Sequence, residues 1–362
     1  MLRALAIAWV MLFHSFIVGG LGDGFAWLSR HGWVGVDIFF VLSGYLIGCQ
    51  LLRPLQRGEP LQLGAFYARR AWRILPAFAV VLAVYACAPA LREEPGLQPW
   101  WQFATFTMNF TIDYLRNPAF SHAWSLCVEE HFYLLFPLLA WALARKRSMG
   151  WFVGASVAVI VVGVASRTAV WLHDMRMDPP RNWFIEDIYY PTWMRLDGLF
   201  AGVMLATLRV YRPHAWDRCQ RHANAALAAG MVVVAFAFWL FRNRTGLLGN
   251  SIGWPILSFG FGLLVFAAAD RRSVIGRWRV PATGWIAAVS YSLYLSHKLA
   301  MHAVQAALAS AATLPRVVVF VVYVVVIVLV GAALHYLVEQ PFLRWRDRSV
   351  PASRAAVASV PA

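Results

Sequence analysis

Long apolar runs recur along the whole chain and are separated by short polar segments. A transmembrane helix needs about 20 mainly apolar residues. A further apolar stretch over 100–112 is too short to span and predicts a partial or interfacial helix. Ten longer runs predict an all-α polytopic membrane protein, a bundle of about ten transmembrane helices over residues 2–21, 33–53, 74–91, 123–144, 150–171, 190–208, 223–241, 250–269, 284–308 and 316–338.

The basic residues between these runs predict the orientation of the chain. Cytoplasmic loops of membrane proteins carry an excess of Lys and Arg. With a cytoplasmic N-terminus, the segments on that side hold 21 basic residues and the opposite loops hold eight. An odd number of helices would mix the two groups, so we expect ten crossings of the inner (plasma) membrane with cytoplasmic N- and C-termini. The loop with Arg242 and Arg244 is an exception, because it carries two arginines on the side opposite to the cytoplasm.

Composition supports a membrane protein over a soluble one. The chain is 60% hydrophobic and 14% charged, whereas soluble domains carry about a quarter charged residues. The net charge of +15 would suggest a nucleic-acid partner in a soluble protein, but here topology explains it, so we expect a lipid bilayer and no nucleic acid. We assign residues 1–349 to one integral membrane domain and 350–362, rich in Ala, Ser and Pro, to a short disordered cytoplasmic tail. No residue spacing typical of a metal site occurs.

The first run contains two ionisable residues on one helical face. Arg3 and His14 are eleven positions apart, which places them about 20° apart around a helix and roughly 16 Å apart along it. A cation at the cytoplasmic rim suits a phosphate-bearing ligand, and a neutral imidazole at depth suits a general base. An equally compatible interpretation makes Arg3 a topology charge and His14 a hydrogen-bonding core residue.

A basic cluster precedes the third run. Arg69, Arg70 and Arg73 lie within the segment FYARRAWRILP over 66–76, at helical spacings of three and four residues. Such a cluster suits a pyrophosphate held by bidentate hydrogen bonds. Taken alone, the cluster is more typical of positive charges that anchor a helix at the cytoplasmic side.

The fourth run begins with a polar stripe. Ser125, Glu129 and Tyr133 follow one another at intervals of four residues, so they share one face of an otherwise apolar helix, and Glu130 is expected to face elsewhere. Ionisable residues inside a span mark function by default. The alternative is a polar helix start at the interface. Weaker candidates for a supporting polar network are Asp37, Arg195 with Asp197 as a mutually neutralising pair, His297, and Glu339, after which Pro341 is expected to end the helix.

Six motifs in order resemble the acyltransferase-3 family of membrane O-acyltransferases, over almost the whole chain. They are Arg3 with His14, GVDIFFVLSG over 35–44, RRAWRILP over 69–76, WSLCVEEHFY over 124–133, RLDGL over 195–199 and SYSLYLSH over 290–297. The resemblance implies a ten-helix bundle that transfers an acyl group from cytoplasmic acyl-coenzyme A to a hydroxyl of an extracytoplasmic or lipid-linked glycan. It assigns catalysis to His14, with Glu129 as the helix-four carboxylate, and places Arg3, Arg70 and Arg73 in the family's basic motifs.

The residues agree with these implications. Coenzyme A is a highly charged cytoplasmic molecule, and Arg3, Arg69, Arg70 and Arg73 all fall on the predicted cytoplasmic side. We therefore expect acyl-coenzyme A, foremost acetyl-coenzyme A, as co-substrate and no bound cofactor. His14 would take the proton of the acceptor hydroxyl, with a carboxylate such as Glu129 holding its tautomer; an acyl-His intermediate is the rival.

Buried charges also mark substrate pathways, so the alternative function is a transporter or flippase of a glycan or organic anion. Transporters often have repeated halves and paired broken helices, and neither is evident here. The expected enzyme is an acyltransferase that acts on a saccharide acceptor.

Overall fold

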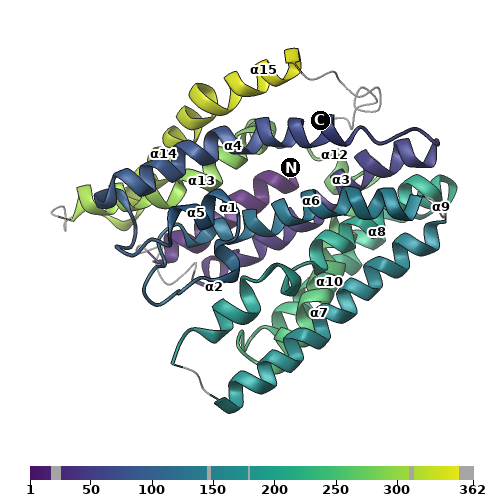
Figure 1. Cartoon of the computed structure of the whole chain (residues 1–362), viewed down its shortest axis with the longest axis horizontal. Helices are drawn as coiled ribbons and strands as arrows, with labels where there is room; N and C mark the ends of the chain where they lie inside the picture. Colours follow the sequence, from purple (N-terminus) through teal and green to yellow (C-terminus); the bar gives the residue numbers. More distant parts are fainter. Residues whose placement is uncertain (18–25, 145–147, 178–179, 310–313, 350–362) are drawn as a thin grey trace.

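The computed structural model describes residues 1–17, 26–144, 148–177, 180–309 and 314–349. Over these ranges the chain is helical, and its only pairing of extended segments is an isolated bridge between Leu97 and Ala119. The predicted tail at 350–362 lies outside the described residues. The ten longest helices of the described part form a bundle (Figure 1) and are α1 (Leu2–Ile17), α3 (Gly35–Gln56), α4 (Leu63–Cys87), α6 (Trp124–Ala144), α7 (Met149–Met177), α8 (Asp197–Tyr211), α10 (Ala223–Leu240), α11 (Trp254–Ala268), α13 (Thr283–Leu308) and α14 (Arg316–Leu334).

Shorter elements connect these helices. The segment over 100–112, expected to form a partial helix, holds α5 (Trp100–Ala104) and a 3-10 turn over Met108–Phe110. The other short elements include α2 (Ala26–Arg30), α9 (Pro213–Gln220), α12 (Val274–Arg277), α15 (Gln340–Ser349), the π-helical segments Phe184–Tyr189, Gly249–Gly253 and His335–Glu339, and several 3-10 turns.

Several helices have the length and the apolar surface of membrane spans. Seven helical stretches in the described ranges are long and apolar enough to cross a membrane, and they include α3, α4, α6, α7, α10, α11 and α14. Large apolar side chains cover their outer faces; Val317 is 74% exposed and Val232 is 69% exposed. A water-soluble protein would bury such side chains, so the fold is that of a multi-pass membrane protein. The ten crossings and the cytoplasmic termini stay predictions.

Two helices begin well away from the residues expected. Helix α4 begins at Leu63, eleven residues before the apolar run, because a helix continues beyond its apolar part as long as its backbone hydrogen bonds continue. The arginine cluster therefore lies on α4 itself. Helix α8 begins only at Asp197, because Pro191 and the 3-10 turn Thr192–Met194 precede it.

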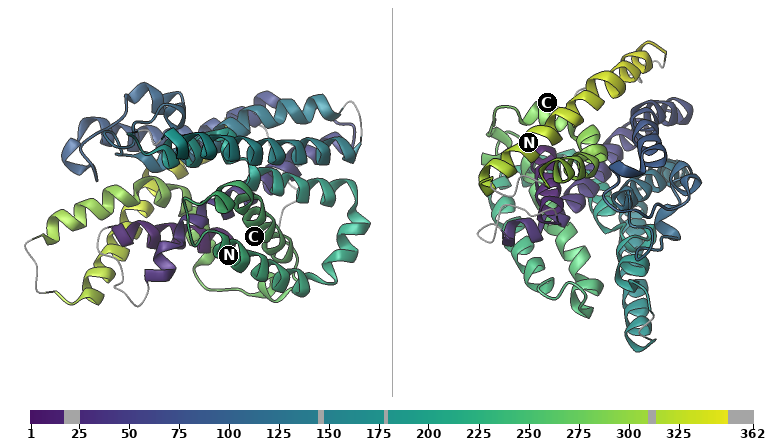
Figure 2. Two further views of the ribbon diagram at one scale, coloured as in Figure 1. Left: turned by 90° about the horizontal axis from the view of Figure 1, so that it is seen from below. Right: turned by 90° about the vertical axis from the view of Figure 1, so that its left-hand side faces the viewer.

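The expectation that Pro341 ends the last helix is wrong. The chain passes from α14 through a π-helical segment, His335–Glu339, into α15, and Pro341 lies in the first turn of α15. Proline removes one backbone donor from a helix, and a π-helical turn accommodates such an interruption. In Figure 2, α15 and α7 lie at opposite edges of the bundle.

Helix α3 packs against α8 at backbone contact. A Cβ atom at Gly44 would lie 1.9 Å from the carbonyl oxygen of Leu199, and one at Gly202 would lie 2.2 Å from that of Val41. Only glycine permits this approach, which is typical of helix pairs inside membranes. The approach fixes α3, which supplies one wall of the site described next.

Candidate active site

A cavity of about 80 Å³ lies among α1, α3, α4, α6 and α13. Each of the five helices contributes at least one polar side chain to it, so it is polar although it lies inside an apolar bundle. Its lining consists of Arg3, Val36, Phe39, Phe40, Ser43, Arg70, Arg73, Ile74, Ser125, Leu126, Glu129, Glu130, Tyr133, Ser290, Tyr291 and Tyr294.

Three of the four predicted donor-binding arginines line this cavity. The guanidinium of Arg70 lies 4.4 Å from the centre of the Tyr133 ring, and the Nε of Arg3 is buried without a hydrogen-bond partner among the described residues. Arg73 lies 3.6 Å from the carboxylate of Glu339. Arg69 points elsewhere, with its guanidinium 3.9 Å from the carboxylate of Asp347. The cavity therefore presents a cluster of cations to any ligand that enters.

The polar stripe of α6 faces the same cavity. Glu129 accepts a hydrogen bond of 2.7 Å from the Ser43 hydroxyl, and Tyr133 donates to that hydroxyl at 3.1 Å. Ser125, Glu129 and Tyr133 line the cavity together, as their spacing predicts. The expectation that Glu130 faces elsewhere is wrong, because it also lines the cavity. Neighbouring residues are only 100° apart around a helix, so one cavity can reach both carboxylates.

His14 lies outside the cavity lining and is paired with a second histidine. Its Nδ1 lies 2.9 Å from Nε2 of His297, and Nδ1 of His297 lies 2.7 Å from the carbonyl oxygen of Tyr294. A carbonyl only accepts, so His297 carries its proton on Nδ1, and its Nε2 accepts from His14 when both rings are neutral. Nε2 of His14 then keeps a free lone pair. The residue that sets the tautomer of His14 in this structure is His297, and Glu129 is bonded to Ser43 instead.

A third histidine, His122, completes the cluster and was missed in the sequence. Its ring lies 4.9 Å from the His297 ring and 6.2 Å from the His14 ring, between centroids. Its Nε2 lies 3.4 Å from the carbonyl of Leu295, and its buried Nδ1 has no hydrogen-bond partner among the residues described. No regular spacing connects positions 14, 122 and 297, so only the fold brings them together.

Tyr294 joins the cavity to the histidine cluster. Its hydroxyl lies in the cavity wall, 2.5 Å from the Ser125 hydroxyl, and donates to the carbonyl of His122 at 2.7 Å. Its own carbonyl accepts the hydrogen bond of His297. One residue of the cavity wall, Tyr294, therefore holds the histidine pair.

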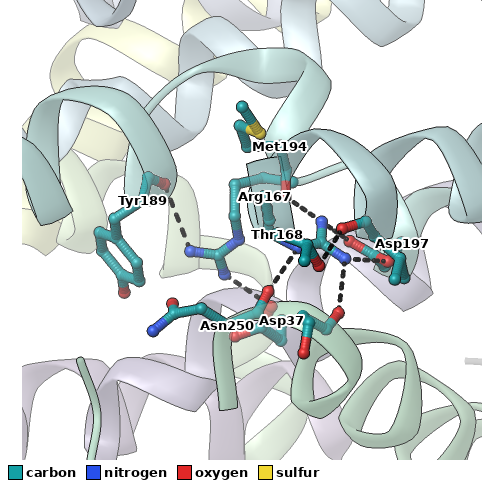
Figure 3. A network of polar contacts seen from close by, with 10 residues as sticks. Asp37, Arg167, Thr168, Tyr189, Met194, Asp197 and Asn250 are labelled. Atoms are coloured by element: carbon teal, nitrogen blue, oxygen red, sulfur yellow. Dashed lines mark hydrogen bonds and ion pairs between the residues drawn. The ribbon is translucent and has the colours of Figure 1, made fainter. Parts of the chain in front are cut away.

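The expected pair of Arg195 with Asp197 does not form, because each residue has another partner. Arg195 binds Asp37 of α3 at 2.8 Å, and Asp197 accepts two hydrogen bonds, at 2.7 and 3.0 Å, from Arg167 of α7 (Figure 3). Only two positions separate Arg195 from Asp197, and Arg195 precedes the helix that Asp197 begins, so the side chains diverge. These two crossed ion pairs connect α3, α7 and α8.

Glu339 is also buried, at the junction of α14 and α15. It accepts hydrogen bonds of 2.8 Å from Ser292 and from His335, in addition to its ion pair with Arg73. Glu339 therefore links the last helices to the arginine side of the cavity.

The sequence model of the acyltransferase-3 family, described as an acyltransferase domain, matches residues 1–336. The chain belongs to the acyltransferase-3 family. The six motifs noted in the sequence all lie within the matched residues. No solved structure matches the chain.

Relatives of this acyltransferase-3 chain have names that refer to O-acetyl transfer. A protein of Staphylococcus aureus strain MRSA252 with a provisional O-acetyltransferase name is 26% identical over 97% of the chain and 59% of its own length. The O-acetyltransferase OatA of S. aureus strain NCTC 8325 is 27% identical over 82% of the chain and 49% of its own length. The peptidoglycan O-acetyltransferase OatA of Listeria monocytogenes is 30% identical over 57% of the chain and 32% of its own length. The chain thus spans less than two thirds of these relatives.

One buried charge in the acyltransferase-3 domain had a signal that sequence reasoning passed over. Arg167 lies in the middle of an apolar run, where an ionisable residue marks a functional or structural role by default. It is fully buried and bonds to Asp197 and to three backbone carbonyls, those of Met194, Asn250 and Ser251. His14 was selected because it is an ionisable residue inside an apolar run, and Arg167 meets the same criterion.

Proposed function

We propose that the protein is an integral inner-membrane O-acyltransferase with ten crossings and cytoplasmic termini. It moves an acetyl group from cytoplasmic acetyl-coenzyme A to a hydroxyl of a cell-surface or lipid-linked saccharide. The observation that carries the proposal is a cavity that is lined by three arginines and by Tyr294, whose carbonyl accepts the hydrogen bond of the His14–His297 pair. The O-acetyltransferase names of the relatives support it.

The arginines suit the charged end of the donor. Coenzyme A carries several phosphate charges, and Arg3, Arg70 and Arg73 belong to the predicted cytoplasmic side. Guanidinium groups bind phosphate through two parallel hydrogen bonds, which fixes both position and orientation. The thioester arm then lies along the cavity towards Tyr294 and the histidines.

The chemistry assigned to His14 follows from its tautomer. Nε2 of His14 takes the proton of the acceptor hydroxyl while the hydroxyl oxygen attacks the thioester carbonyl carbon. The carbon–sulfur bond then breaks, and the proton passes from His14 to the departing thiolate, so that free coenzyme A thiol and the acetyl ester result. Throughout these steps, Nε2 of His297 accepts the hydrogen bond from the Nδ1–H of His14, so His297 acts as a positioning residue.

The test uses the purified full-length chain in proteoliposomes with labelled acetyl-coenzyme A and a glycan extract. Thiol release that depends on the extract, together with label recovered in the glycan, is the expected result. If the chain moves an organic anion or a glycan across the bilayer without releasing thiol, the transporter alternative holds instead.

Replacing Arg70 with Ala is expected to raise KM for acetyl-coenzyme A about tenfold to a hundredfold, with a smaller change in kcat. The substitution removes a charge-assisted hydrogen-bond donor from the cavity. Arg57→Ala is the matched control, because Arg57 is an exposed arginine of the same predicted side with its guanidinium 3.9 Å from Glu59. Equal KM values in the two variants would show that Arg70 does not bind the donor and only anchors its helix at the predicted cytoplasmic side.

Replacing His297 with Leu is expected to lower kcat about tenfold to a hundredfold, because His14 loses the acceptor that orients its ring. His297→Gln keeps an oxygen acceptor near the position of Nε2, so it is expected to recover much of the rate. Steady-state kinetics and the pH profile of kcat measure both variants. A purely packing role predicts that Leu and Gln are equivalent, or that Leu is better.

A further inference from the structure

Arg244 lies in an aromatic cage in the loop that breaks the predicted charge rule. The centre of its guanidinium lies 4.8 Å from the ring centre of Tyr189, 5.0 Å from Trp33, 5.6 Å from Phe184 and 5.8 Å from Phe13. Each ring face attracts the guanidinium, so four rings hold this one cation in place. The loop follows α10, on the predicted extracytoplasmic side.

The charge of Arg244 has no anionic partner in the described part of the chain. Its Nε is buried without a hydrogen bond, and no described carboxylate lies within ion-pair distance of it. Arg181, in another loop of the predicted extracytoplasmic side, is different, because it pairs with Glu186 at 3.3 Å and Asp187 at 2.7 Å. The hydrogen bond that Arg181 donates to the Asp187 carboxylate raises the pKa of the Arg181 guanidinium. Of these two arginines, only Arg244 has no carboxylate partner among the described residues.

The backbone around Arg244 is held rigidly. The Asn250 side chain donates to the carbonyl of Arg244 at 3.0 Å, and the Trp171 indole donates to the carbonyl of Thr245 at 2.7 Å. Asn250 is fixed in turn, because its carbonyl accepts a hydrogen bond of 2.8 Å from Arg167 (Figure 3). A cation that is held in place before a ligand arrives costs little ordering entropy on binding.

The cage lies between an open groove and the helix that carries His14. Phe184 belongs to both the cage and the groove, and Thr245 of the groove follows Arg244 directly. On the other side, the Phe13 ring of the cage lies 5.2 Å from the His14 ring. The groove is lined by Leu115, Pro180, Arg181, Asn182, Trp183, Phe184 and Thr245.

We propose that this groove and cage form the acceptor site, and that its ligand is a saccharide that carries an anionic group, a carboxylate or a phosphate. The half-buried ring of Trp183 in the groove offers a flat apolar face to a sugar ring, and Arg244 beside the groove offers a bidentate donor to the anion. The inference rests on the proposed function, because it assumes that the hydroxyl activated by His14 belongs to the bound saccharide. It narrows the acceptor from saccharides in general to acidic ones.

The test measures binding without catalysis. A uronic-acid disaccharide, its methyl ester and a sugar phosphate are titrated against the full-length protein in detergent, with tryptophan fluorescence as the readout. The wild type is expected to bind the two acidic probes about tenfold or more tightly than the ester. The tighter acidic probe identifies the anion. Equal binding of acid and ester by the wild type would overturn the proposal.

The variants separate the anion site from general stability. Arg244→Gln is expected to abolish the preference for acid over ester, and Arg244→Lys to retain part of it because it keeps the charge without the bidentate geometry. Arg242→Gln is the matched control, an exposed arginine of the same loop that stacks on Trp239. A preference that survives in Arg244→Gln overturns the proposal. Binding and acetyl transfer are separate readouts, so selective binding without transfer contradicts the proposed function and leaves the anion site intact.

Discussion

Replacing His14 with Ala is expected to lower acetyl transfer by about 10²- to 10⁴-fold while the protein still folds and inserts. General base catalysis contributes about this much when one side chain takes the reacting proton. The structure favours His14 for this step because His297 fixes its proton on Nδ1 and leaves Nε2 free. His14→Gln is expected to be equally inactive, because an amide is not a base. Thiol release and label transfer to the glycan measure the loss.

A control histidine makes this test specific. His302 lies on α13, as His297 does, but it is only partly buried and is not part of the histidine cluster. His302→Ala is expected to keep the wild-type rate. Wild-type turnover by His14→Ala would contradict the catalytic assignment, and Nδ1 of His122 would be the next base to examine.

The positions of the helices follow from the sequence because the hydropathy of each run determines them. A run of about 20 apolar residues has few stable alternatives to a helix in a membrane, since its backbone groups must bond internally. Helices were therefore predicted at the right places even where their ends were not. The ends depend on local chemistry that hydropathy does not register. Leu63, Pro191 and Pro341 are three such cases.

The partners of buried polar residues did not follow from the sequence. Helical spacing correctly grouped Ser125, Glu129 and Tyr133, because they belong to one helix. Spacing carries no information on contacts between helices that are distant in the chain. The crossed pairing of Arg195 and Asp197 depends on where α3 and α7 pack, and the meeting of His14 with His297 depends on α1 and α13.

One polar network supports both ends of the proposed reaction. Arg167 holds Asp197 at the start of α8 and also the carbonyl of Asn250, whose side chain fixes Arg244. Close packing of α8 on α3 places Ser43, which binds Glu129 in the cavity. A residue that touches neither proposed substrate therefore positions parts of both binding regions.

Replacing Arg167 with Ala is accordingly expected to give a large loss of stability, about 3–5 kcal/mol in the free energy of unfolding. The substitution leaves the carboxylate of Asp197, 3% exposed, without its cation and leaves three backbone carbonyls without their donor. Reversible unfolding in mixed detergent with SDS measures the change. Arg116→Ala is the control, because the Arg116 side chain is 85% exposed and lies 3.9 Å from Asp113, so its loss is expected to cost under about 1 kcal/mol.

The double variant Arg167→Ala with Asp197→Ala distinguishes an electrostatic cause from a loss of packing. Removing the unpaired carboxylate removes the largest desolvation penalty, so the double variant is expected to be more stable than Arg167→Ala alone. If packing dominated, the second truncation would add a further loss, and the double variant would be the less stable of the two. A double variant at least as unstable as the single one would therefore show that Arg167 stabilises the bundle mainly by filling space.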